Sequence, residues 1–339
     1  MEADAIAGLS ACLIVEGETR WCGGYGDRDP DQGLPAYPST PFLLASVSKT
    51  VVAVADMMAV EDGTLTLDDP INNRLDFTVN HPDDPGNPIT LRHLMSHTSG
   101  IADNWDIMDA HYVDGDSAEP LGAFLESYLT PDGEDYRPFA NFYEEGVGGV
   151  TEYSNIGASL AAYLVESATG TPFDRYTEER IFEPLNMSGG WFLADLDLNE
   201  VAVPTLVEGG EFVTIPHFGV PDYPDGQLRS DAHSMARFLS MVDNGGVFEG
   251  TRYLTEDSVD EMLTPHYNNL DDTQGLIWYW WTLDGADVWG HNGGETGTST
   301  EIMVREEDGV GTVVLMNSEG QNRTLERVER AMLAAAEEL

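Results

Sequence analysis

The spacing of hydrophobic residues predicts strands at both ends of the chain and helices in between. Residues 10–25 form two short hydrophobic runs around a Glu16-Gly17 turn, the pattern of an antiparallel hairpin. After Gly275, β-branched and aromatic runs divided by Gly and Asp turns predict four more strands, over 276–283, 286–290, 299–305 and 310–317. A final amphipathic pattern over 325–338 predicts a helix.

Helical spacing and capping residues mark the middle of the chain. They predict helices that follow Ser46, Thr90, Asn155, Pro172, Ser230 and Thr255, with one more over 121–129. The whole pattern predicts an α/β fold of the α+β type, in which one antiparallel sheet from both chain ends is flanked by helices. We assign residues 1–64 and 236–339 to a sheet lobe and 65–235 to an inserted, mostly helical lobe, with the candidate site between them.

Composition and charge exclude several classes of partner. The 339 residues are 41% hydrophobic, enough for a large core, and they carry a formal net charge of −46. The 61 acidic residues are spread along the chain, so nucleic acids and anionic membranes would be repelled and neither is expected as a partner. Such a surface fits a protein that works at high salt, where screening weakens self-repulsion. A moderately acidic secreted protein is the alternative.

No apolar run approaches the ~20 residues of a membrane-spanning helix, so membrane insertion is not expected. Residues Met1–Ala5 lack the basic segment of a signal peptide. The sequence leaves the compartment and the oligomeric state open.

The two cysteines, Cys12 and Cys22, lie on opposite arms of the predicted hairpin, where the short loop sets them opposite each other. They form no Cys-x-x-Cys motif, which argues against a zinc or thioredoxin-type site. A disulfide in an exported protein and a pair of free buried thiols both fit this arrangement.

Lys49 is the only lysine of the chain, and the other fourteen basic residues are arginines. Arginine keeps its proton near neutral pH, whereas a lysine in a desolvated site can lose it. The composition therefore indicates a position that requires an amine able to become neutral.

Ser46 precedes Lys49 by three residues at the start of a predicted helix, so the two side chains share one helix face. A serine hydroxyl becomes a nucleophile when a nearby base takes its proton, and N–H groups at a helix start favour developing negative charge. The stretch Ser46-Val-Ser-Lys49 thus predicts an acyl-transfer centre. A capping serine beside a solvated lysine is the alternative.

Two later stretches offer further groups. In Tyr153-Ser-Asn155, the two outer side chains point the same way from an extended chain, and a tyrosine near a cationic lysine would have a lowered pKa. In the stretch that starts at His291 and continues Asn292-Gly293-Gly294, glycines let a strand backbone approach a substrate, where a free N–H can bind an oxyanion. The alternatives are a buried tyrosine with an Asn N-cap and a glycine-rich turn with a surface histidine.

Together, Ser46-Val-Ser-Lys49, Tyr153-Ser-Asn155 and His291-Asn-Gly293 resemble the ordered motifs of the serine β-lactamase and penicillin-binding-protein superfamily. The resemblance is closest to the branch of class C β-lactamases, D-alanyl-D-alanine carboxypeptidases, D-aminopeptidases and related esterases. It covers nearly the whole chain, and it implies a β-lactamase/transpeptidase-like fold with no metal and no cofactor.

The resemblance also implies roles for single residues. Ser46 would be the acylated nucleophile, Lys49 its base, and Tyr153 a shared general acid and base. Asn155 would bind the substrate amide or carbonyl, and the backbone N–H groups of Ser46 and Gly294 would form the oxyanion hole.

The strand that carries His291, Asn292 and Gly293 is expected to contact substrate, and it departs from the family pattern at its first position. Many members carry Lys-Thr-Gly there, and the lysine helps to bind a substrate carboxylate. A neutral imidazole supplies one hydrogen bond and little charge near pH 7.5, so the preference for β-lactams is in doubt.

The resemblance therefore implies a serine hydrolase that acts through an acyl-enzyme on small esters or amides, with weak β-lactam turnover. A class C-like β-lactamase, a D-alanyl-D-alanine carboxypeptidase or D-aminopeptidase, and an inert family scaffold are the alternatives. His93 and His97 have a metal-ligand spacing but no third ligand, and we expect structural roles for them. The acidic stretch 103–116 matches no calcium loop and is predicted to be a solvated loop.

Overall fold

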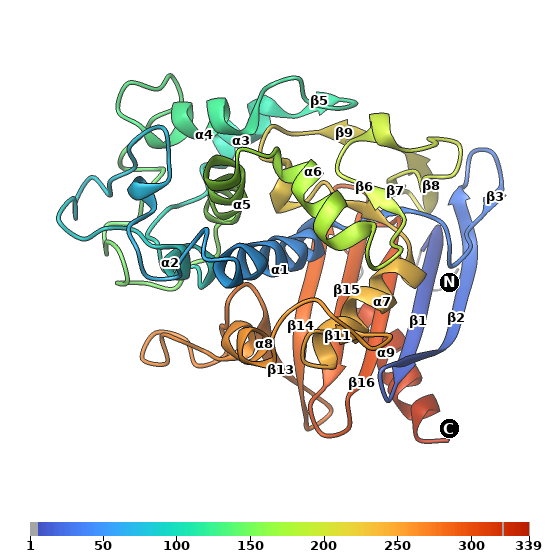
Figure 1. The fold of residues 1–339 in the computed structure, drawn as a ribbon. Helices are drawn as coiled ribbons and strands as arrows, with labels where there is room; N and C mark the ends of the chain where they lie inside the picture. The colour runs from blue at the N-terminus through green and yellow to red at the C-terminus, as the bar shows by residue number, and fades with distance from the viewer. Residues whose placement is uncertain (1–5, 321, 339) are drawn as a thin grey trace.

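An antiparallel sheet built from both ends of the chain organises the structure, a computed structural model that describes residues 6–320 and 322–338. Its seven strands lie in the order β13-β14-β15-β16-β1-β2-β3 (Figure 1). The strands are β1 (Gly8–Val15), β2 (Glu18–Asp29), β3 (Leu34–Pro35), β13 (Tyr279–Leu283), β14 (Ala286–Glu295), β15 (Thr298–Arg305) and β16 (Val310–Met316). The predicted fold class is confirmed.

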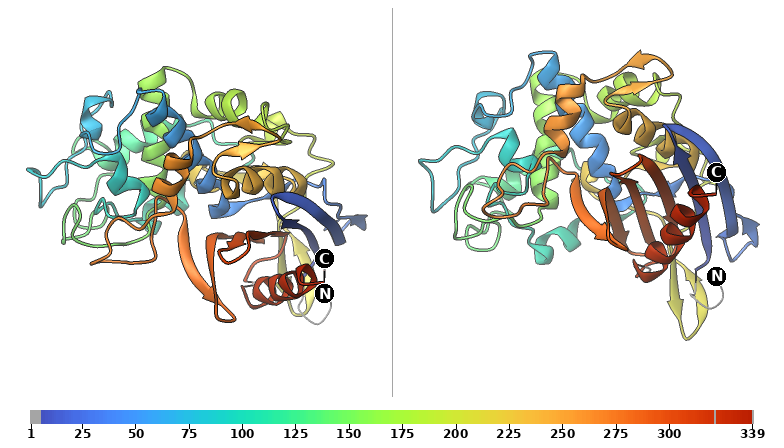
Figure 2. Two further views of the ribbon diagram at one scale, coloured as in Figure 1. Left: turned by 60° about the horizontal axis from the view of Figure 1, so that its bottom comes forward. Right: turned by 90° about the horizontal axis from the view of Figure 1, so that it is seen from below.

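Alternating side chains give the sheet two buried faces. On β1, Cys12 and Ile14 face the large core, whereas Leu9, Ala11 and Leu13 face a second cluster. Helix α7 (Ala232–Asp243) covers the first face, and α9 (Asn322–Ala336) covers the second (Figure 2). Because both faces are covered, the central strands are buried along nearly their whole length.

The remaining helices form the other side of the molecule (Figure 1). They are α1 (Ser48–Glu61), α2 (Leu91–Met95), α3 (Trp105–Met108), α4 (Leu121–Leu129), α5 (Asn155–Thr169), α6 (Phe173–Thr177) and α8 (Glu256–Leu263). Helix α1 is buried from Ser48 to Ala59 because it packs against helices such as α5 and α8, and the 3₁₀ turn Ala45–Val47 that precedes it contacts β14 and β15. The lobe boundaries at 64/65 and 235/236 remain predictions.

Within the described ranges, one small three-stranded sheet and three two-stranded sheets lie outside the main sheet. They are β4 (Phe42–Leu43), β6 (Gly189–Gly190) and β10 (Arg229–Ser230) in one sheet, and the pairs β5 (Val113–Asp114) with β9 (Phe218–Gly219), β7 (Thr205–Glu208) with β8 (Glu211–Thr214), and β11 (Val247–Phe248) with β12 (Thr251–Arg252). None of the helices in the described part of the chain combines the length and apolar character that a bilayer span requires.

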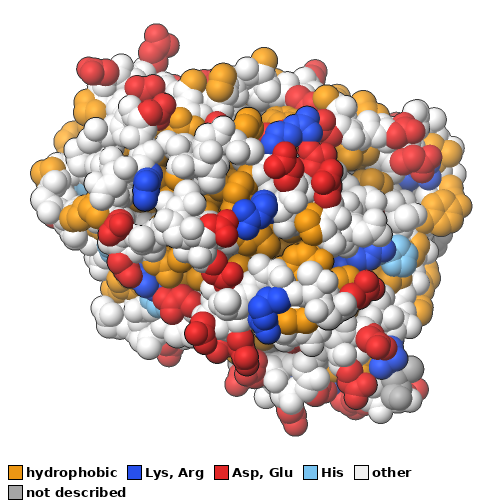
Figure 3. Space-filling view, viewed as in Figure 1, with side chains coloured by type: hydrophobic (Ala, Val, Ile, Leu, Met, Phe, Trp, Pro, Cys, Tyr) orange, Lys and Arg blue, Asp and Glu red, His pale blue; other side chains and the backbone are white. Residues whose placement is uncertain are grey.

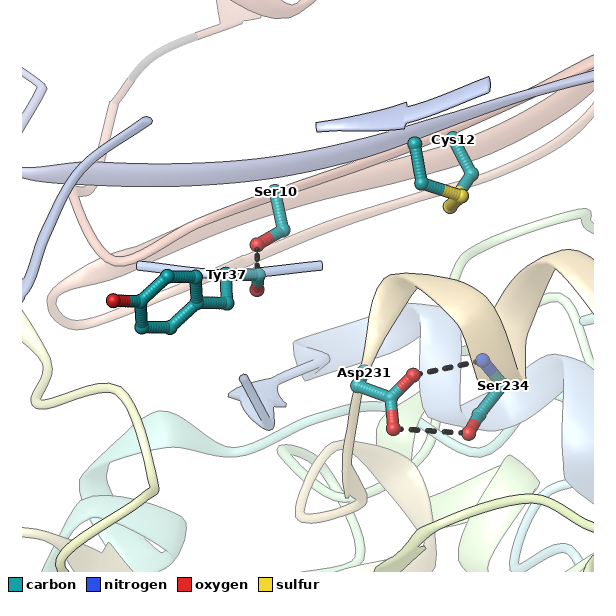
Figure 4. Close-up of a disulfide and its surroundings, with 6 residues drawn as sticks. Ser10, Cys12, Tyr37, Asp231 and Ser234 are labelled. Atoms are coloured by element: carbon teal, nitrogen blue, oxygen red, sulfur yellow. Dashed lines mark hydrogen bonds between the residues drawn. A yellow bond between two sulfur atoms is a disulfide. The ribbon is translucent and has the colours of Figure 1, made fainter. Parts of the chain in front are cut away.

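The two cysteines are joined by a disulfide in the structure. Cys12 and Cys22 face each other across β1 and β2, with 4.1 Å between their Cα atoms. The bond lies beside the start of α7, where Asp231 caps the helix by accepting a hydrogen bond from the Ser234 N–H at 2.9 Å (Figure 4). The hairpin prediction is confirmed, and of the two states that the sequence left open the structure has the disulfide.

Several predicted boundaries are wrong by one or more residues. The N-cap of α5 is Ser154, whose hydroxyl accepts from the Gly157 N–H at 2.8 Å, and Asn155 is the first helical residue. Asp231, rather than Ser230, caps α7. Strand β14 continues to Glu295, five residues beyond its predicted end, because His291 to Glu295 pair in register with Ile302 to Thr298 of β15.

Candidate active site

Ser46 lies on a tight turn that aims it at the first turn of α1. The 3₁₀ turn Ala45–Val47 leads directly into the helix, and Ala45 has a positive φ of 47°, in the left-handed region that non-glycine residues rarely adopt. The Lys49 Nζ donates a hydrogen bond to Ser46 Oγ over 3.1 Å. The predicted pairing of the two side chains on one face is thus present in the structure, and their catalytic roles remain a proposal.

Lys49 is completely buried, and its ammonium has carboxylate and phenol neighbours. Its Nζ also donates to the backbone carbonyl of Asp225. Burial lowers the pKa of this amine, but Tyr153, Asp225 and Asp103 together raise it, and the net pKa lies above the usual lysine value. Lys49 is therefore protonated in the resting site. The sequence indicated an amine able to become neutral, and its acidic neighbours, which the sequence did not reveal, keep it protonated at rest.

Tyr153 completes a compact group with the serine and the lysine. Lys49 Nζ lies 5.0 Å from the centroid of its ring, and the Tyr153 hydroxyl interacts with both Lys49 and Ser46. The residue as a whole is 42% exposed, although its hydroxyl end is enclosed by these groups. Burial raises the pKa of Tyr153, and the opposing effect of Lys49 is smaller. The expected lowering of this pKa is wrong for the resting site.

Asp103 anchors the segment that carries Tyr153, and the sequence did not reveal it. One carboxylate oxygen accepts from the backbone N–H and the side-chain amide of Asn155, each at 2.9 Å, and the other accepts from the Ile156 N–H at 3.1 Å. Burial raises the pKa of Asp103, while these bonds lower it. The prediction of a solvated loop is wrong at this position, since Asp103 satisfies N–H groups at the start of α5.

Asn155 is buried, and one N–H of its side-chain amide donates to Asp103 at 2.9 Å, a bond that leaves the second N–H and the carbonyl oxygen of the amide unused. Binding of substrate by Asn155 remains a prediction.

The glycines of β14 bring this strand against the turn that carries Ser46. A Cβ atom at Gly293 would lie 2.4 Å from Thr300 Oγ1, 2.5 Å from the Leu44 carbonyl and 3.1 Å from the Ser46 nitrogen. Thr300 Oγ1 donates to that Leu44 carbonyl at 2.6 Å, which fastens the turn to β15. Only glycine fits at 293, and the contact brings the Ser46 N–H beside β14. Gly294 follows with no atom within 4 Å of a Cβ built on it, so its surroundings are open.

His291 is held in one tautomer by the backbone. Its Nδ1 lies 2.5 Å from the Asn292 carbonyl, and because a carbonyl only accepts, the proton is on Nδ1. Its Nε2 is then a bare acceptor, which is buried and without a hydrogen-bond partner in the structure. Burial, followed by the nearby Lys49, lowers the pKa of His291 to about 3. The ring is 2% exposed, so the reading as a surface histidine is wrong.

Asn292 is exposed, and its backbone N–H donates to the Tyr279 hydroxyl at 3.2 Å. The Tyr279 ring in turn meets the His291 ring edge-on at 5.2 Å. Position 292 is therefore placed on the outer side of the strand from His291 and Gly293.

The two histidines with metal-ligand spacing have separate structural partners. His93 Nδ1 accepts from the Thr90 N–H at 3.2 Å and closes a capping box at the start of α2. His97 Nδ1 accepts from the Ser154 N–H at 3.2 Å, and its ring packs 4.6 Å from Tyr153. His97 thus supports the Tyr153 segment, a role that its sequence position did not indicate.

Two further carboxyl groups lie close to Lys49. Burial raises the pKa of Asp222 to about 7, with Asp103 adding to the rise, and burial raises the pKa of Asp225 well above its usual value. Both residues belong to the 3₁₀ segment around Tyr223–Asp225, where side-chain spacing shows no periodic pattern. The site therefore has one basic side chain, Lys49, among several acidic ones.

Comparison with known proteins supplies the family. Residues 1–337 match the family model described as Beta-lactamase. The "Putative penicillin-binding protein PbpX" of Bacillus subtilis is 26% identical over 278 residues, which cover 80% of this chain and 61% of that protein. "Protein flp" of Staphylococcus aureus is 21% identical over 320 residues, which cover 92% of this chain and 60% of that protein. The chain thus matches about three fifths of the length of these relatives.

Solved structures share the fold. The penicillin binding protein of Bacillus halodurans superposes with a TM-score of 0.77 at 23% identity, covering 95% of both chains. The D-amino acid amidase of Ochrobactrum anthropi SV3, complexed with D-phenylalanine, gives a TM-score of 0.76 at 21% identity and covers 98% of this chain and 96% of that one. The resemblance inferred from the three motifs is confirmed, and the chain belongs to the Beta-lactamase family.

Proposed function

We propose that this protein is a serine hydrolase that works through an acyl-enzyme on small esters or amides. The observation that carries the proposal is the hydrogen bond from the buried Lys49 Nζ to Ser46 Oγ, with the Tyr153 hydroxyl against both groups. A serine hydroxyl needs such a proton-exchanging partner to attack a carbonyl carbon.

Four steps follow from this arrangement. The Lys49 and Tyr153 pair accepts the Ser46 proton as Ser46 Oγ forms a bond to the substrate carbonyl carbon. The oxyanion that develops accepts hydrogen bonds from the Ser46 and Gly294 N–H groups. The same pair returns the proton to the leaving oxygen or nitrogen as its bond to the acyl group breaks. Water then attacks the acyl-enzyme and releases the acid, with the proton transfers reversed.

The resting charges decide how the pair starts. Both pKa values are raised, so Lys49 is an ammonium and Tyr153 a phenol before substrate binds. Lys49 and Tyr153 together must therefore lose one proton before they can accept the proton of Ser46. Because the two groups interact, that loss is described by a pKa of the pair rather than of either residue.

An active-site probe tests the proposal directly. A fluorophosphonate should label Ser46, and p-nitrophenyl butyrate should be turned over, while Ser46→Ala loses both. Lys49→Arg should lower kcat by at least ~10³-fold, because arginine cannot give up its proton. An unlabelled wild-type protein without ester turnover would indicate the inert scaffold instead.

A second candidate is hydrolysis of D-amino acid amides or peptides, and the fold shared with D-amino acid amidase favours it. β-Lactam hydrolysis is the third, and the absence of a cation at position 291 places it behind the others. Comparing p-nitrophenyl esters, nitrocefin and D-alanyl-D-alanine peptides as substrates ranks the three.

A further inference from the structure

The charge around the candidate site points to the kind of substrate it takes, an inference that rests on the proposed hydrolase function. In lysine-bearing relatives, the first residue of the Lys-Thr-Gly motif presents a cation to a substrate carboxylate. Here the corresponding ring, His291, uses its only N–H for the Asn292 carbonyl. The His291 ring that lies near Tyr153 and Lys49 is neutral, and its Nε2 is an acceptor without a hydrogen-bond partner in the structure. The strand therefore offers no side-chain cation to an anionic substrate at this position.

A carboxylate stands one residue beyond the candidate oxyanion hole. Glu295 follows Gly294 at the end of β14, and its Oε2 accepts a hydrogen bond from the Tyr112 hydroxyl at 2.7 Å. Tyr112 precedes β5, so this bond joins the helical side of the molecule to the sheet. Burial, followed by the charge of Glu295, raises the pKa of Tyr112, which therefore remains a neutral donor. The other oxygen of Glu295 accepts from the Thr296 N–H at 2.6 Å, so both oxygens are oriented.

This carboxylate lines a cavity that begins at Gly294, the residue after Gly293, which itself lies against the Ser46 turn. The cavity has a volume of about 480 Å³ and is bordered by Gly294, Glu295 and Glu319, and its described lining contains no arginine or lysine. A group attached to a carbonyl carbon at Ser46 and reaching past Gly294 would enter it. Burial, followed by the charge of Asp222, raises the pKa of Asp225 well above its usual value, and the nearby Glu295 adds to the rise. The charge of Glu295 therefore already disfavours a second anion here, and a positive group beside Glu295 would be favoured instead.

We propose that the site selects substrates whose acyl part carries an ammonium group, and that Glu295, oriented by Tyr112, is the specificity-determining residue. The acyl part is the substrate end that passes Gly294 towards Glu295, and a carboxylate there meets only like charge. The preference is electrostatic, so it weakens as salt screens the charges.

Three p-nitroanilides with one leaving group test the idea in the wild-type protein. D-Alanine p-nitroanilide carries an ammonium, N-acetyl-D-alanine p-nitroanilide is neutral, and N-succinyl-D-alanine p-nitroanilide is an anion. At pH 6.5, below the usual α-amino pKa of about 7.7–8.0, kcat/KM should fall in that order. The cation-to-neutral ratio should decrease between low salt and molar NaCl. An anion that matches or exceeds the cation overturns the proposal.

Two variants locate the preference. Glu295→Gln should reduce the cation-to-neutral ratio about fivefold to thirtyfold, the effect of one charge-assisted contact. Tyr112→Phe keeps the charge but releases the carboxylate, so it should reduce the ratio by a smaller factor. Asp257→Asn, an exposed position on α8, removes the same charge elsewhere and should leave the ratio unchanged. An unchanged ratio in Glu295→Gln, or an equal loss in Asp257→Asn, rejects Glu295 as the determinant.

The proposed function and this inference fail in different ways. If wild-type protein does not hydrolyse p-nitrophenyl butyrate and Ser46 is not labelled by a fluorophosphonate, the hydrolase proposal fails and takes the inference with it. If the ester is hydrolysed and Ser46 is labelled, but kcat/KM is equal for the three anilides or is highest for the anion, only the inference fails.

Discussion

Tyr153 contacts both Ser46 and Lys49, and its pKa bears on the catalytic role proposed for it. Burial raises that pKa, so the phenol holds its proton at rest and can donate it to a leaving group. His97 packs against the ring and Asp103 fixes the following residues, so the hydroxyl is positioned by groups outside the reacting set. The Tyr153 side chain is therefore suited to the chemical step rather than to packing alone.

We expect Tyr153→Phe to lower kcat for p-nitrophenyl butyrate by ~10²–10⁴-fold, because the variant removes a proton carrier but keeps the ring. Steady-state kinetics measures the effect, and circular dichroism controls for folding. Near-wild-type turnover in a folded Phe variant would assign Tyr153 to packing.

His291 provides a second prediction, now that its environment is known. Its pKa is lowered to about 3, so the ring stays neutral from pH 7.5 down to pH 6. The ratio of kcat/KM for nitrocefin to that for p-nitrophenyl butyrate should not rise over this range, although an unperturbed histidine would predict a rise. His291→Lys should raise the ratio about fivefold to thirtyfold by supplying a cation for the carboxylate.

A ratio that rises towards pH 6 in the wild-type protein would mean that His291 gains a proton when substrate binds. An unchanged ratio in a folded His291→Lys variant would mean that position 291 does not face the carboxylate.

Helix α1 carries Lys49 and also a carboxylic acid, Asp56, that has no hydrogen-bond partner among the described residues. Asp56 is completely buried, and neither of its oxygens is hydrogen-bonded in the structure. Burial raises its pKa well above the usual value. The folded protein therefore holds a proton on Asp56 that the unfolded chain releases above about pH 4, and the associated stability is lost as pH rises through the folded-state pKa.

Asp56→Asn mimics the protonated acid at every pH. It should match wild type near pH 4 and be more stable by about 1–3 kcal/mol near pH 8, because the cost of keeping an acid neutral disappears. Thermal or urea denaturation across this range measures the difference, with the exposed Asp257→Asn as control. If the difference in unfolding free energy between Asp56→Asn and wild type does not grow with pH, Asp56 is hydrated or paired in solution.

Periodic elements could be predicted from the sequence, and the residues between them could not. Strands and helices can be recognised from side-chain spacing, and the placement of Cys12 opposite Cys22 followed from a short hairpin turn, whereas the disulfide itself did not. The three motifs of the candidate site lie at the ends of elements, where the family resemblance identified them. Asp103 and Asp225 lie in irregular segments and act through contacts distant in sequence, so no local pattern marked them.

The acidic surface sets the conditions under which all of these groups operate. Acidic side chains are scattered over the face shown in Figure 3, with few basic ones between them. Long-range repulsion of this kind and the proposed attraction of cationic substrates depend on the same charges. Salt should therefore act on stability and on specificity in opposite directions, stabilising the fold while weakening the preference for an ammonium group.

The formal charge of −46 predicts how the melting temperature responds to salt. Two effects compete, because salt weakens the surface ion pairs of arginine but also screens repulsion among carboxylates. Exposed ion pairs contribute about 0–1 kcal/mol each, and only 15 basic residues are present to pair with 61 acidic ones, so repulsion dominates. The Debye length falls from about 10 Å at 0.1 M to about 3 Å at 1 M. We therefore expect the melting temperature to rise from low salt to molar KCl or NaCl, as measured by differential scanning calorimetry. A curve that is flat or falls would show that the carboxylates do not repel strongly in the folded state, and the case for adaptation to high salt would be lost.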